Sequence, residues 1–465
     1  MSAMRQVVCT AQDGLVNDEI PLRYDNAPVL TAEDYGGRIQ ALLEQGKEYS
    51  HLVIYADKEH FSNLDYLIGY DPRYEECILV LRRGELPALL LGNEGMGQSL
   101  CVTVPHEKLL FQALSPMGQS RVGSLPLEEI LRRQGIGGNA KVGVLGWKYF
   151  DCNEFSDGLH SFEVPAYLIA ALNRTGAAVE NANRLLMDCG TGLRAVQDDK
   201  TIILSELAST KASRKVWDFM RGLRPGMTEL EASQLLNIDG EPCPTYPNIC
   251  FAGRGILSPD YHRRLEEDAP IAFGMGYRYA QIHRVGIYTR SREAFEAAYP
   301  GVYEHVYQRY FAAVTVWFEH LRLGATGGEV WEAVRQVVGS YRDFGIALNP
   351  GHLIASEEWL GSPFQEGCGI PLTSGMLIQC DFTARPAAYG GVGVHIEDGV
   401  ALLGPAARAR LRELAPDSYQ RMVNRRDFMR NTLGIEVADE VLPTSDLCGV
   451  LHPFLGDLGK IFVNR

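Results

Sequence analysis

Apolar positions in the first third of the chain alternate between two spacings. From Thr31 to about Gln45 they recur every three to four residues, which predicts an amphipathic helix that begins after Thr31. Short apolar runs at 52–56, 77–81, 88–91 and 142–145 predict strands, and residues 82–85 predict the turn between the second and third runs. Helical spacing returns at 125–133 and 165–172. The pattern therefore predicts an α/β domain over residues 1–178.

The remainder, residues 179–465, has a different pattern. Helical spacing covers 198–223, and 271–289 reads as a β-hairpin, two β-rich runs joined by a short turn. Segments 223–231 and 321–329 share one order, in which a helix end and a glycine precede a Thr-x-x-Glu capping box. This likeness fits either coincidence, since capping boxes are common, or a domain with approximate internal two-fold symmetry.

Composition narrows the class of protein. The chain has 465 residues, 46% hydrophobic and 22% charged, with a net charge of −14, which allows more than one core and argues against a nucleic-acid partner. No apolar run approaches the ~20 residues that span a bilayer, and the N-terminus has no signal-peptide pattern, so we expect no membrane partner. The ten cysteines are scattered without a CxxC pair, which predicts reduced thiols and a cytoplasmic protein.

Three segments of the second part carry the side chains of most chemical interest: Asn349-Pro-Gly-His352, the run 374–381 ending in Asp381, and Val394-His-Ile-Glu397-Asp398. They resemble the metal-ligand segments of the creatinase/prolidase/aminopeptidase P superfamily, and the segment 63–69 is similar to part of its N-terminal domain. The resemblance implies an α/β N-terminal domain, 1–178, followed by an α+β pita-bread domain, 179–465, with pseudo-two-fold symmetry and an active site on its inner face. It also implies a homodimer.

The resemblance bears on metal binding as well. Metallopeptidases of this superfamily use two Asp, one His and two Glu; His352, Asp381 and Glu397 match the last three, whereas Gly274 and about Val285 stand in place of the hairpin aspartates. Two carboxylates and one imidazole are too few for two divalent ions. We therefore expect no metal cofactor. The alternative is one divalent ion on His352, Asp381 and Glu397, joined by a histidine at 283 or 395.

Creatinase is the metal-free member of the superfamily, and it cleaves a C–N bond with a histidine and two carboxylates. By resemblance, the position of its histidine falls at Leu257, so creatine hydrolysis itself is not expected. An imidazole and two carboxylates from His352, Asp381 and Glu397 would still suit general acid/base catalysis or recognition of a cationic nitrogen. Because Asp381 follows an apolar strand, we expect it to have a partner.

Alternatives stand beside these assignments. His352 is either a site residue or a turn histidine, and Glu397 is either a site residue or a solvated strand end. We assign His283 and His395 to substrate binding, although they could lie at the surface. The same assignment is made for His60 and Arg73, which either reach the pocket of a neighbouring subunit, as in family dimers, or make local contacts.

Three hypotheses for function follow. The first is a metal-independent enzyme that cleaves a C–N bond in a small polar nitrogen-containing metabolite, with His352, Asp381 and Glu397 as its catalytic residues. The second is a metallopeptidase like Xaa-Pro aminopeptidase or prolidase. The third is a non-catalytic member of the family that binds a small molecule.

Overall fold

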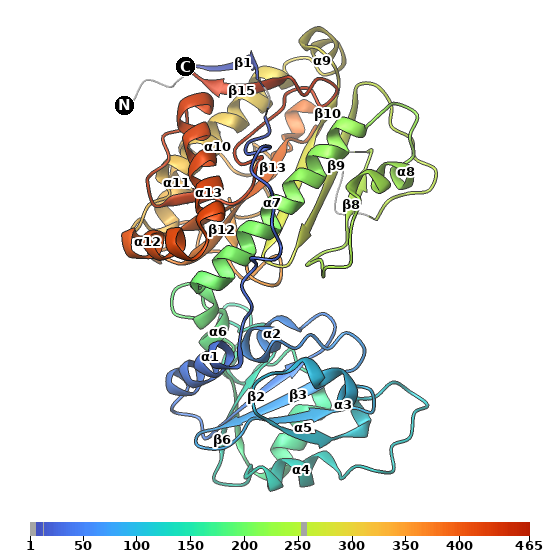
Figure 1. Cartoon of the computed structure of the whole chain (residues 1–465), viewed down its shortest axis with the longest axis vertical. Coiled ribbons are helices and arrows are strands. Elements are labelled where there is room, and N and C mark those ends of the chain that lie inside the picture. Colours follow the sequence, from blue (N-terminus) through green and yellow to red (C-terminus); the bar gives the residue numbers. More distant parts are fainter. Residues whose placement is uncertain (1–5, 13, 253–257) are drawn as a thin grey trace. The chain divides into compact units, whose positions relative to one another are not determined.

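The computed structural model describes residues 6–12, 14–252 and 258–465. The chain divides into an N-terminal unit, Val29–Ala195, and a C-terminal unit formed by Met1–Pro28 together with Val196–Arg465 (Figure 1). Within the described residues, no helix combines the length and the apolar character needed to cross a membrane.

The N-terminal unit is built on a six-stranded mixed sheet, in the order β5-β4-β3-β2-β6-β7. The helix predicted after Thr31 is present and begins with a capping box between Thr31 and Asp34. The strands predicted at 77–81 and 88–91 pair antiparallel. The strands are β2 His51–Ala56, β3 Cys77–Arg82, β4 Ala88–Leu91, β5 Glu107–Leu110, β6 Lys141–Leu145 and β7 Ala178–Asn181. The helices are α1 Ala32–Gln45, α2 Ser62–Ile68, α3 Gly95–Gln98, α4 Leu127–Arg133, α5 Ala166–Thr175 and α6 Arg184–Met187.

The C-terminal unit contains a seven-stranded antiparallel sheet, in the order β11-β12-β13-β10-β9-β8, with β14 also paired to β13. The strands are β8 Asn248–Cys250, β9 Ala269–Tyr277, β10 Ala280–Tyr288, β11 His352–Leu353, β12 Met376–Asp381, β13 His395–Leu402 and β14 Val441–Pro443. A separate ribbon pairs β1 Val7–Ala11 with β15 Lys460–Asn464. The main helices are α7 Asp199–Gly222, α8 Glu229–Ser233, α9 Arg292–Ala298, α10 Arg309–His320, α11 Gly327–Val338, α12 Pro405–Leu414 and α13 Pro416–Phe428.

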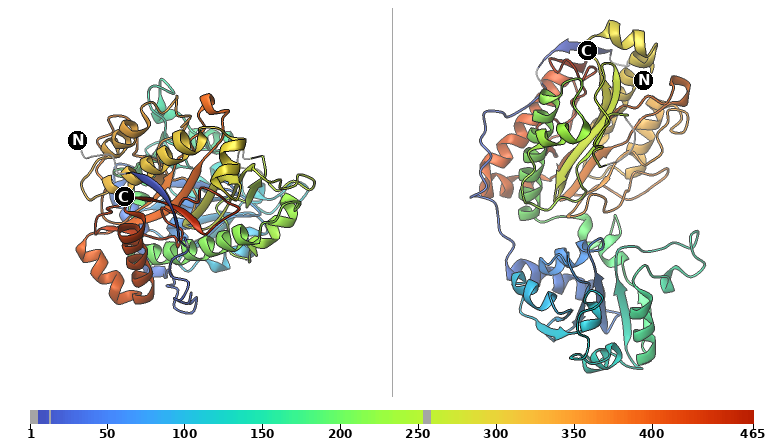
Figure 2. Two further views of the ribbon diagram at one scale, coloured as in Figure 1. Left: turned by 90° about the horizontal axis from the view of Figure 1, so that it is seen from above. Right: turned by 90° about the vertical axis from the view of Figure 1, so that its right-hand side faces the viewer.

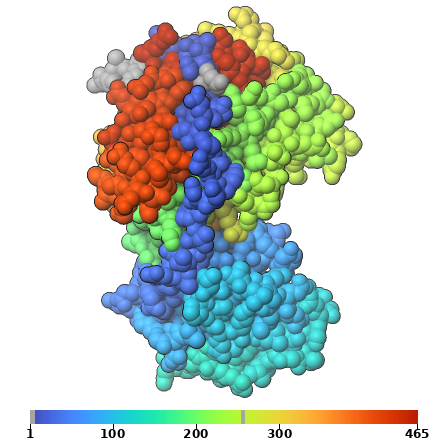
Figure 3. Space-filling view, in the orientation of Figure 1, coloured from blue at the N-terminus to red at the C-terminus, as the bar shows by residue number. Residues whose placement is uncertain are grey.

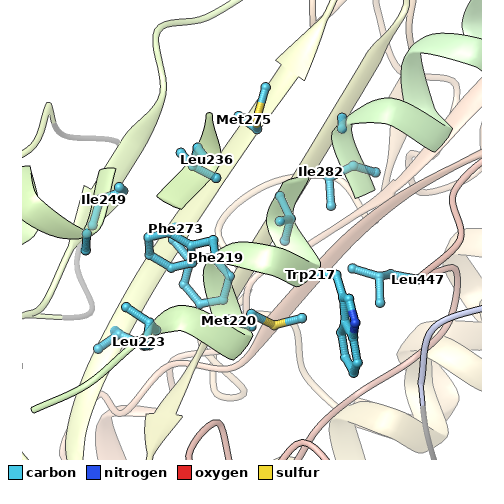
Figure 4. Packing of buried hydrophobic residues seen from close by; sticks show 14 of the residues in the cluster. Trp217, Phe219, Met220, Leu223, Leu236, Ile249, Phe273, Met275, Ile282 and Leu447 are labelled. Atoms are coloured by element: carbon cyan, nitrogen blue, oxygen red, sulfur yellow. The ribbon is translucent and has the colours of Figure 1, made fainter. Parts of the chain in front are cut away.

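The predicted hairpin at 271–289 is the pair β9–β10, joined by two residues of which Tyr279 adopts a left-handed φ of 73°. All nine residues of β10 are buried, because helix α7 covers one face of the hairpin and the other face lines the inside of the unit (Figure 2). Side chains from α7, among them Phe219 and Met220, pack against Phe273 and Ile282 (Figure 4). This packing fixes the outer face of the hairpin, so alternate residues of β9 and β10 must point inward.

Residues before 28 belong to the C-terminal unit. Figure 3 shows residues 14–28 in dark blue, running between α7 in green and the orange helices α12 and α13. Polar contacts hold the segment there: the Asn17 side-chain amide donates to the Arg421 carbonyl at 3.0 Å, and Arg214 donates to the Asn17 carbonyl at 2.7 Å.

A buried ionic network ties α7 to α13 beneath this segment. Glu206 accepts hydrogen bonds from Arg421 at 2.5 Å and from Arg425 at 2.8 Å, and Arg425 also pairs with Asp446 at 2.7 Å. All four side chains are buried. Because two guanidinium groups are buried with two carboxylates, loss of either carboxylate would leave a buried charge without its partner.

Glu206→Gln is therefore expected to lower the free energy of unfolding of the C-terminal unit by about 3 kcal/mol or more, since breaking a buried ion pair leaves an uncompensated charge. Urea denaturation followed by circular dichroism measures the change. Glu332→Gln is the matched control, because its pair with Arg335 lies on the surface, and it should leave the transition where it is. Equal transitions for wild type and Glu206→Gln would contradict this account of the network.

Candidate active site

Strand register brings the candidate site together on the inner face of the large sheet. Asp381 of β12 lies directly opposite Glu397 of β13, Glu397 lies opposite His283 of β10, and His283 lies opposite Gly274 of β9. Residues that are directly opposite in antiparallel strands project to the same face. These residues therefore form one row across four strands, at a cavity of about 200 Å³ that Asp381, Glu397 and His283 line.

His352 begins β11, next to β12, and the turn before it places its side chain near this row. Gly351 has a φ of 116°, and a Cβ there would lie 2.5 Å from the carbonyl oxygen of Gln379, so the turn requires glycine. The indole N–H of Trp317 donates to the Pro350 carbonyl, and the His352 ring stacks on Trp359 at 4.2 Å. These contacts hold His352 in one orientation.

Two carboxylates face the Nε2 atom of His352. This atom lies 3.2 Å from Oε1 of Glu358 and 3.4 Å from Oδ2 of Asp381, while Nδ1 lies 3.1 Å from the Leu353 carbonyl oxygen. Burial lowers the pKa of His352, but the two carboxylates outweigh burial and hold the pKa well above its ordinary value. These surroundings therefore favour the protonated imidazolium form of His352.

The neighbouring carboxyl groups Asp381 and Glu397 have opposite pKa shifts. Burial raises the pKa of Asp381, but its hydrogen bond to His352 and the nearby His395 bring the pKa below its ordinary value. Burial raises the pKa of Glu397 as well, and here Asp381 and Glu358 add to the effect, so the pKa lies well above its ordinary value. The surroundings thus favour the ionised form of Asp381 and the protonated form of Glu397, an arrangement that suits one as a base and the other as an acid.

His283 and His395 form the other side of the cavity. Their rings meet edge to face at 5.0 Å, and Nε2 of His395 lies 3.6 Å from Oδ1 of Asp381. Burial lowers the pKa of both histidines. A Cβ at Gly274 would lie only 2.6 Å from Cδ2 of His283, so the glycine leaves the space that this ring occupies. Both histidines line the cavity.

The side chains fall into two sets of possible metal ligands that share Glu397. One set is His352, Glu358, Asp381 and Glu397, and the other is His283, His395 and Glu397. The ligand atoms within each set lie within 4.8 Å of one another. Imidazole and carboxylate are suitable ligands for a divalent ion, so each set fits one ion. The hairpin itself contributes an imidazole and no carboxylate at this row.

The cavity region contains more possible metal ligands than the sequence indicated. Glu358 was not predicted, because it lies in a loop six residues beyond His352 and follows no periodic pattern. Arg284, whose side chain points to the opposite face, forms a buried ion pair with Asp398 at 2.9 Å and has a structural role. Leu257, the position that we matched to the creatinase histidine, lies outside the described residues.

The two remaining predicted site residues lie in the N-terminal unit, where both have local partners. His60 Nδ1 pairs with Asp57 at 3.0 Å, and Arg73 pairs with Asp71 at 2.6 Å and stacks on Phe61 at 4.8 Å. Their role in substrate binding stays a prediction.

Residues 207–402, which include all five of the histidines and carboxylates predicted for this cavity, match the model of metallopeptidase family M24. The chain carries an M24 domain. No curated protein matches the sequence. The predicted family resemblance is thereby confirmed.

Solved structures similar to this chain extend the likeness beyond the M24 domain. The prolidase from Pyrococcus horikoshii OT3 has 16% sequence identity and a TM-score of 0.59, covering 79% of this chain and 95% of that chain. Dipeptidase PepE from Mycobacterium ulcerans has 19% identity and a TM-score of 0.59, covering 81% and 95%. The Xaa-Pro dipeptidase from Bacillus anthracis has 15% identity and a TM-score of 0.59, covering 80% and 96%. Likeness at these identities establishes the fold, and the predicted pita-bread type of fold is confirmed.

The ion pairs around His352 make a prediction about its titration. In the Glu358→Gln variant the pKa of His352 should fall, because one of the two carboxylates that raise it is gone; histidine ring NMR measures this. Glu357→Gln is the neighbouring control and should leave the His352 titration unchanged. Because the folded-state pKa of His352 exceeds its unfolded value of about 6.5, the stability it contributes is fully present below that pH and is lost as pH rises through the folded-state pKa. A His352 ring that is neutral at pH 7 in the wild type would contradict the arrangement.

Proposed function

We propose that this protein is a hydrolase that cleaves a C–N bond in a small, polar, nitrogen-containing substrate without a metal ion. The observation that carries the proposal is the pair Asp381 and Glu397, which are adjacent on β12 and β13 and whose pKa values are shifted in opposite directions by their surroundings. Pairs of titratable groups whose environments separate their pKa values are characteristic of acid/base catalysis. The M24 domain supports hydrolysis at the level of the family.

In the proposed reaction Asp381 removes a proton from a water molecule, whose oxygen attacks the carbon of the C–N bond. Glu397 donates its proton to the nitrogen, the C–N bond breaks, and an amine leaves. The new C–O bond replaces the C–N bond, and no oxidant or reductant is needed. A proton then passes from Asp381 back to Glu397, which restores the starting state. His352 positions Asp381 and keeps it ionised.

The size of the cavity supports a small substrate. Its volume of about 200 Å³ lies below the roughly 300–1,000 Å³ of most ligand pockets. Besides the titratable groups, Thr245, Gln281 and Leu348 line it, so polar and apolar surfaces are both present.

A second candidate is a one-metal peptidase that acts on Xaa-Pro peptides, as the names of the similar prolidases suggest. The two sets of ligand atoms around Glu397 favour it. A bound divalent ion would polarise the carbonyl group of the scissile bond. His352, Glu358, Asp381 and Glu397 would hold the ion in one set, and His283, His395 and Glu397 in the other.

We also propose the wider features expected from the sequence: a cytoplasmic homodimer that acts on a small molecule, and a C-terminal unit of two related halves. The second proposal is supported by two matching junctions. Thr228 and Thr326 each complete a capping box with the glutamate three residues later. The glycine two residues before each threonine has positive φ and donates to the carbonyl of Leu265 or Leu372 respectively.

Asp381→Asn and Glu397→Gln are each expected to lower kcat by about 10²–10⁴-fold, because each removes one proton-transfer group. Amine release from small guanidino, amidino and N-methylated compounds, and from Xaa-Pro dipeptides, measures activity. Arg410→Gln, which changes a surface ion pair with Asp199, serves as the control and should keep full activity. Full activity in Asp381→Asn would contradict the proposed base.

Enzyme activity, measured as a function of pH, should fall at both acid and alkaline pH. Activity declines at acid pH as Asp381 gains a proton, and at alkaline pH as Glu397 loses one; because these pKa values are shifted apart, a plateau of activity lies between them. An alkaline limb that persists unchanged in Glu397→Gln would rule out Glu397 as the acid.

Chelation separates the two candidates. The metal-independent hydrolase keeps its activity after dialysis against a chelator, and elemental analysis finds no stoichiometric transition metal. The one-metal peptidase loses activity on dialysis and recovers it when a divalent ion is restored.

A further inference from the structure

Asn248 on β8 is a buried amide that lacks partners within the described part of the chain. Its side chain is 1% exposed, and neither Oδ1 nor Nδ2 makes a hydrogen bond there. A buried amide in a native protein is almost always hydrogen-bonded, because leaving both of its polar atoms unpaired is strongly unfavourable. The group that satisfies Asn248 must therefore come from outside these contacts.

The position of Asn248 points to the candidate active site. Asn248 lies directly opposite Gly274, which lies opposite His283, so Asn248 extends the row of inward-facing residues by one strand. Two strand spacings separate Asn248 from His283, about 10 Å between their backbones. Both side chains project from the same face of the sheet.

His283 has an unsatisfied atom of its own. Its Nε2 atom is buried and has no hydrogen-bond partner among the described residues, and the side chain is 8% exposed. The ring leans over Gly274, where a Cβ would come within 2.6 Å of its Cδ2 atom, and it therefore leans towards the strand that carries Asn248. Two unsatisfied polar groups thus flank Gly274, and one of them, His283, lines the cavity.

We propose that Asn248 and His283 together bind a neutral carboxamide or urea-type group of the substrate. The inference rests on the proposed function in placing that substrate in the same cavity. The amide of Asn248 offers both a donor and an acceptor, which match the carbonyl and N–H groups of a second amide. His283 Nε2 supplies one further hydrogen bond. The substrate's scissile C–N bond is then held beside Glu397 and Asp381, which lie one and two strands beyond His283 in the row.

Other chemical groups fit these two side chains less well. A carboxylate has no donor for Oδ1 of Asn248, and it would share the cavity with Asp381 and Glu358. An ammonium group has no acceptor for Nδ2. A site that leaves its own buried polar groups unpaired discriminates against such ligands. Selectivity for a neutral amide is therefore the chemical signature of this subsite.

The test compares three probes of similar size: propionamide, propionate and propylammonium. Binding to the full-length protein is measured by ligand-observed NMR titration, with thermal shift as a second readout. Wild type should bind propionamide in preference to the other two. In Asn248→Leu and Asn248→Ala, propionamide affinity should fall about tenfold or more, because the paired donor and acceptor are gone.

Stability distinguishes a ligand-binding role from a structural one. Asn248→Leu replaces an unsatisfied buried amide with an apolar side chain of the same branching, so it should raise the Tm of the free protein by about 2 °C. Asn464→Leu is the matched control in the same unit: the Asn464 amide donates to Thr315 at 2.9 Å and to two carbonyls, so this variant should lower Tm. A lower Tm in both variants, with propionamide binding unchanged, would overturn the proposal. Asn248→Ala keeps the binding test valid if leucine proves too large to pack.

The Asp381→Asn variant separates this inference from the proposed function. Propionamide should still bind to Asp381→Asn, and its affinity for the double variant with Asn248→Ala should be about tenfold or more lower. This pattern supports the subsite even if no hydrolysis is found in the wild type. Wild type that hydrolyses small substrates but shows no preference for propionamide over propionate and propylammonium would refute the subsite and leave the proposed function intact. An ordered water would then be the partner of Asn248.

Discussion

The close approach of unlike side chains across β12, β13, β10 and β9 is the constraint on which the site depends. One register places Asp381, Glu397 and His283 in adjacent positions of a single row, and a glycine at the next position admits the His283 ring. Slippage by one residue would turn these groups to the outer face, where α7 packs. The apolar packing of α7 against Phe273 and Ile282 therefore holds the register that creates the site.

The carboxyl groups on both faces of the sheet are buried, and burial together with the charged groups beside them determines their pKa values. On the outer face the charge of Asp398 is matched directly by Arg284, and the pair is structural. On the inner face three carboxyl groups converge, and the cation that faces two of them is His352. His352 compensates the charge of Asp381 better than that of Glu397, so the pKa of Asp381 is lowered while the pKa of Glu397 is raised.

Sequence patterns predicted those parts of the molecule that depend on local or periodic signals. The Thr31 cap and the hairpin at 271–289 follow from turn chemistry and from helical or strand spacing. His352, Asp381 and Glu397 were found through a family resemblance. Glu358 and Asn248 were not found, because one lies in a loop without periodicity and the other becomes notable only when its missing partners are known. The pairing of β1 with β15 joins residues more than four hundred positions apart, which no local pattern reveals.

The central claim is that Asp381 and Glu397, although neighbours, hold opposite protonation states at neutral pH. Carbon-13 NMR of side-chain carboxyl groups, assigned with the Asp381→Asn and Glu397→Gln variants, measures this directly. The account predicts that Asp381 is already ionised at acid pH, while Glu397 keeps its proton through pH 7. Two carboxylates that are both ionised at pH 7 would contradict it.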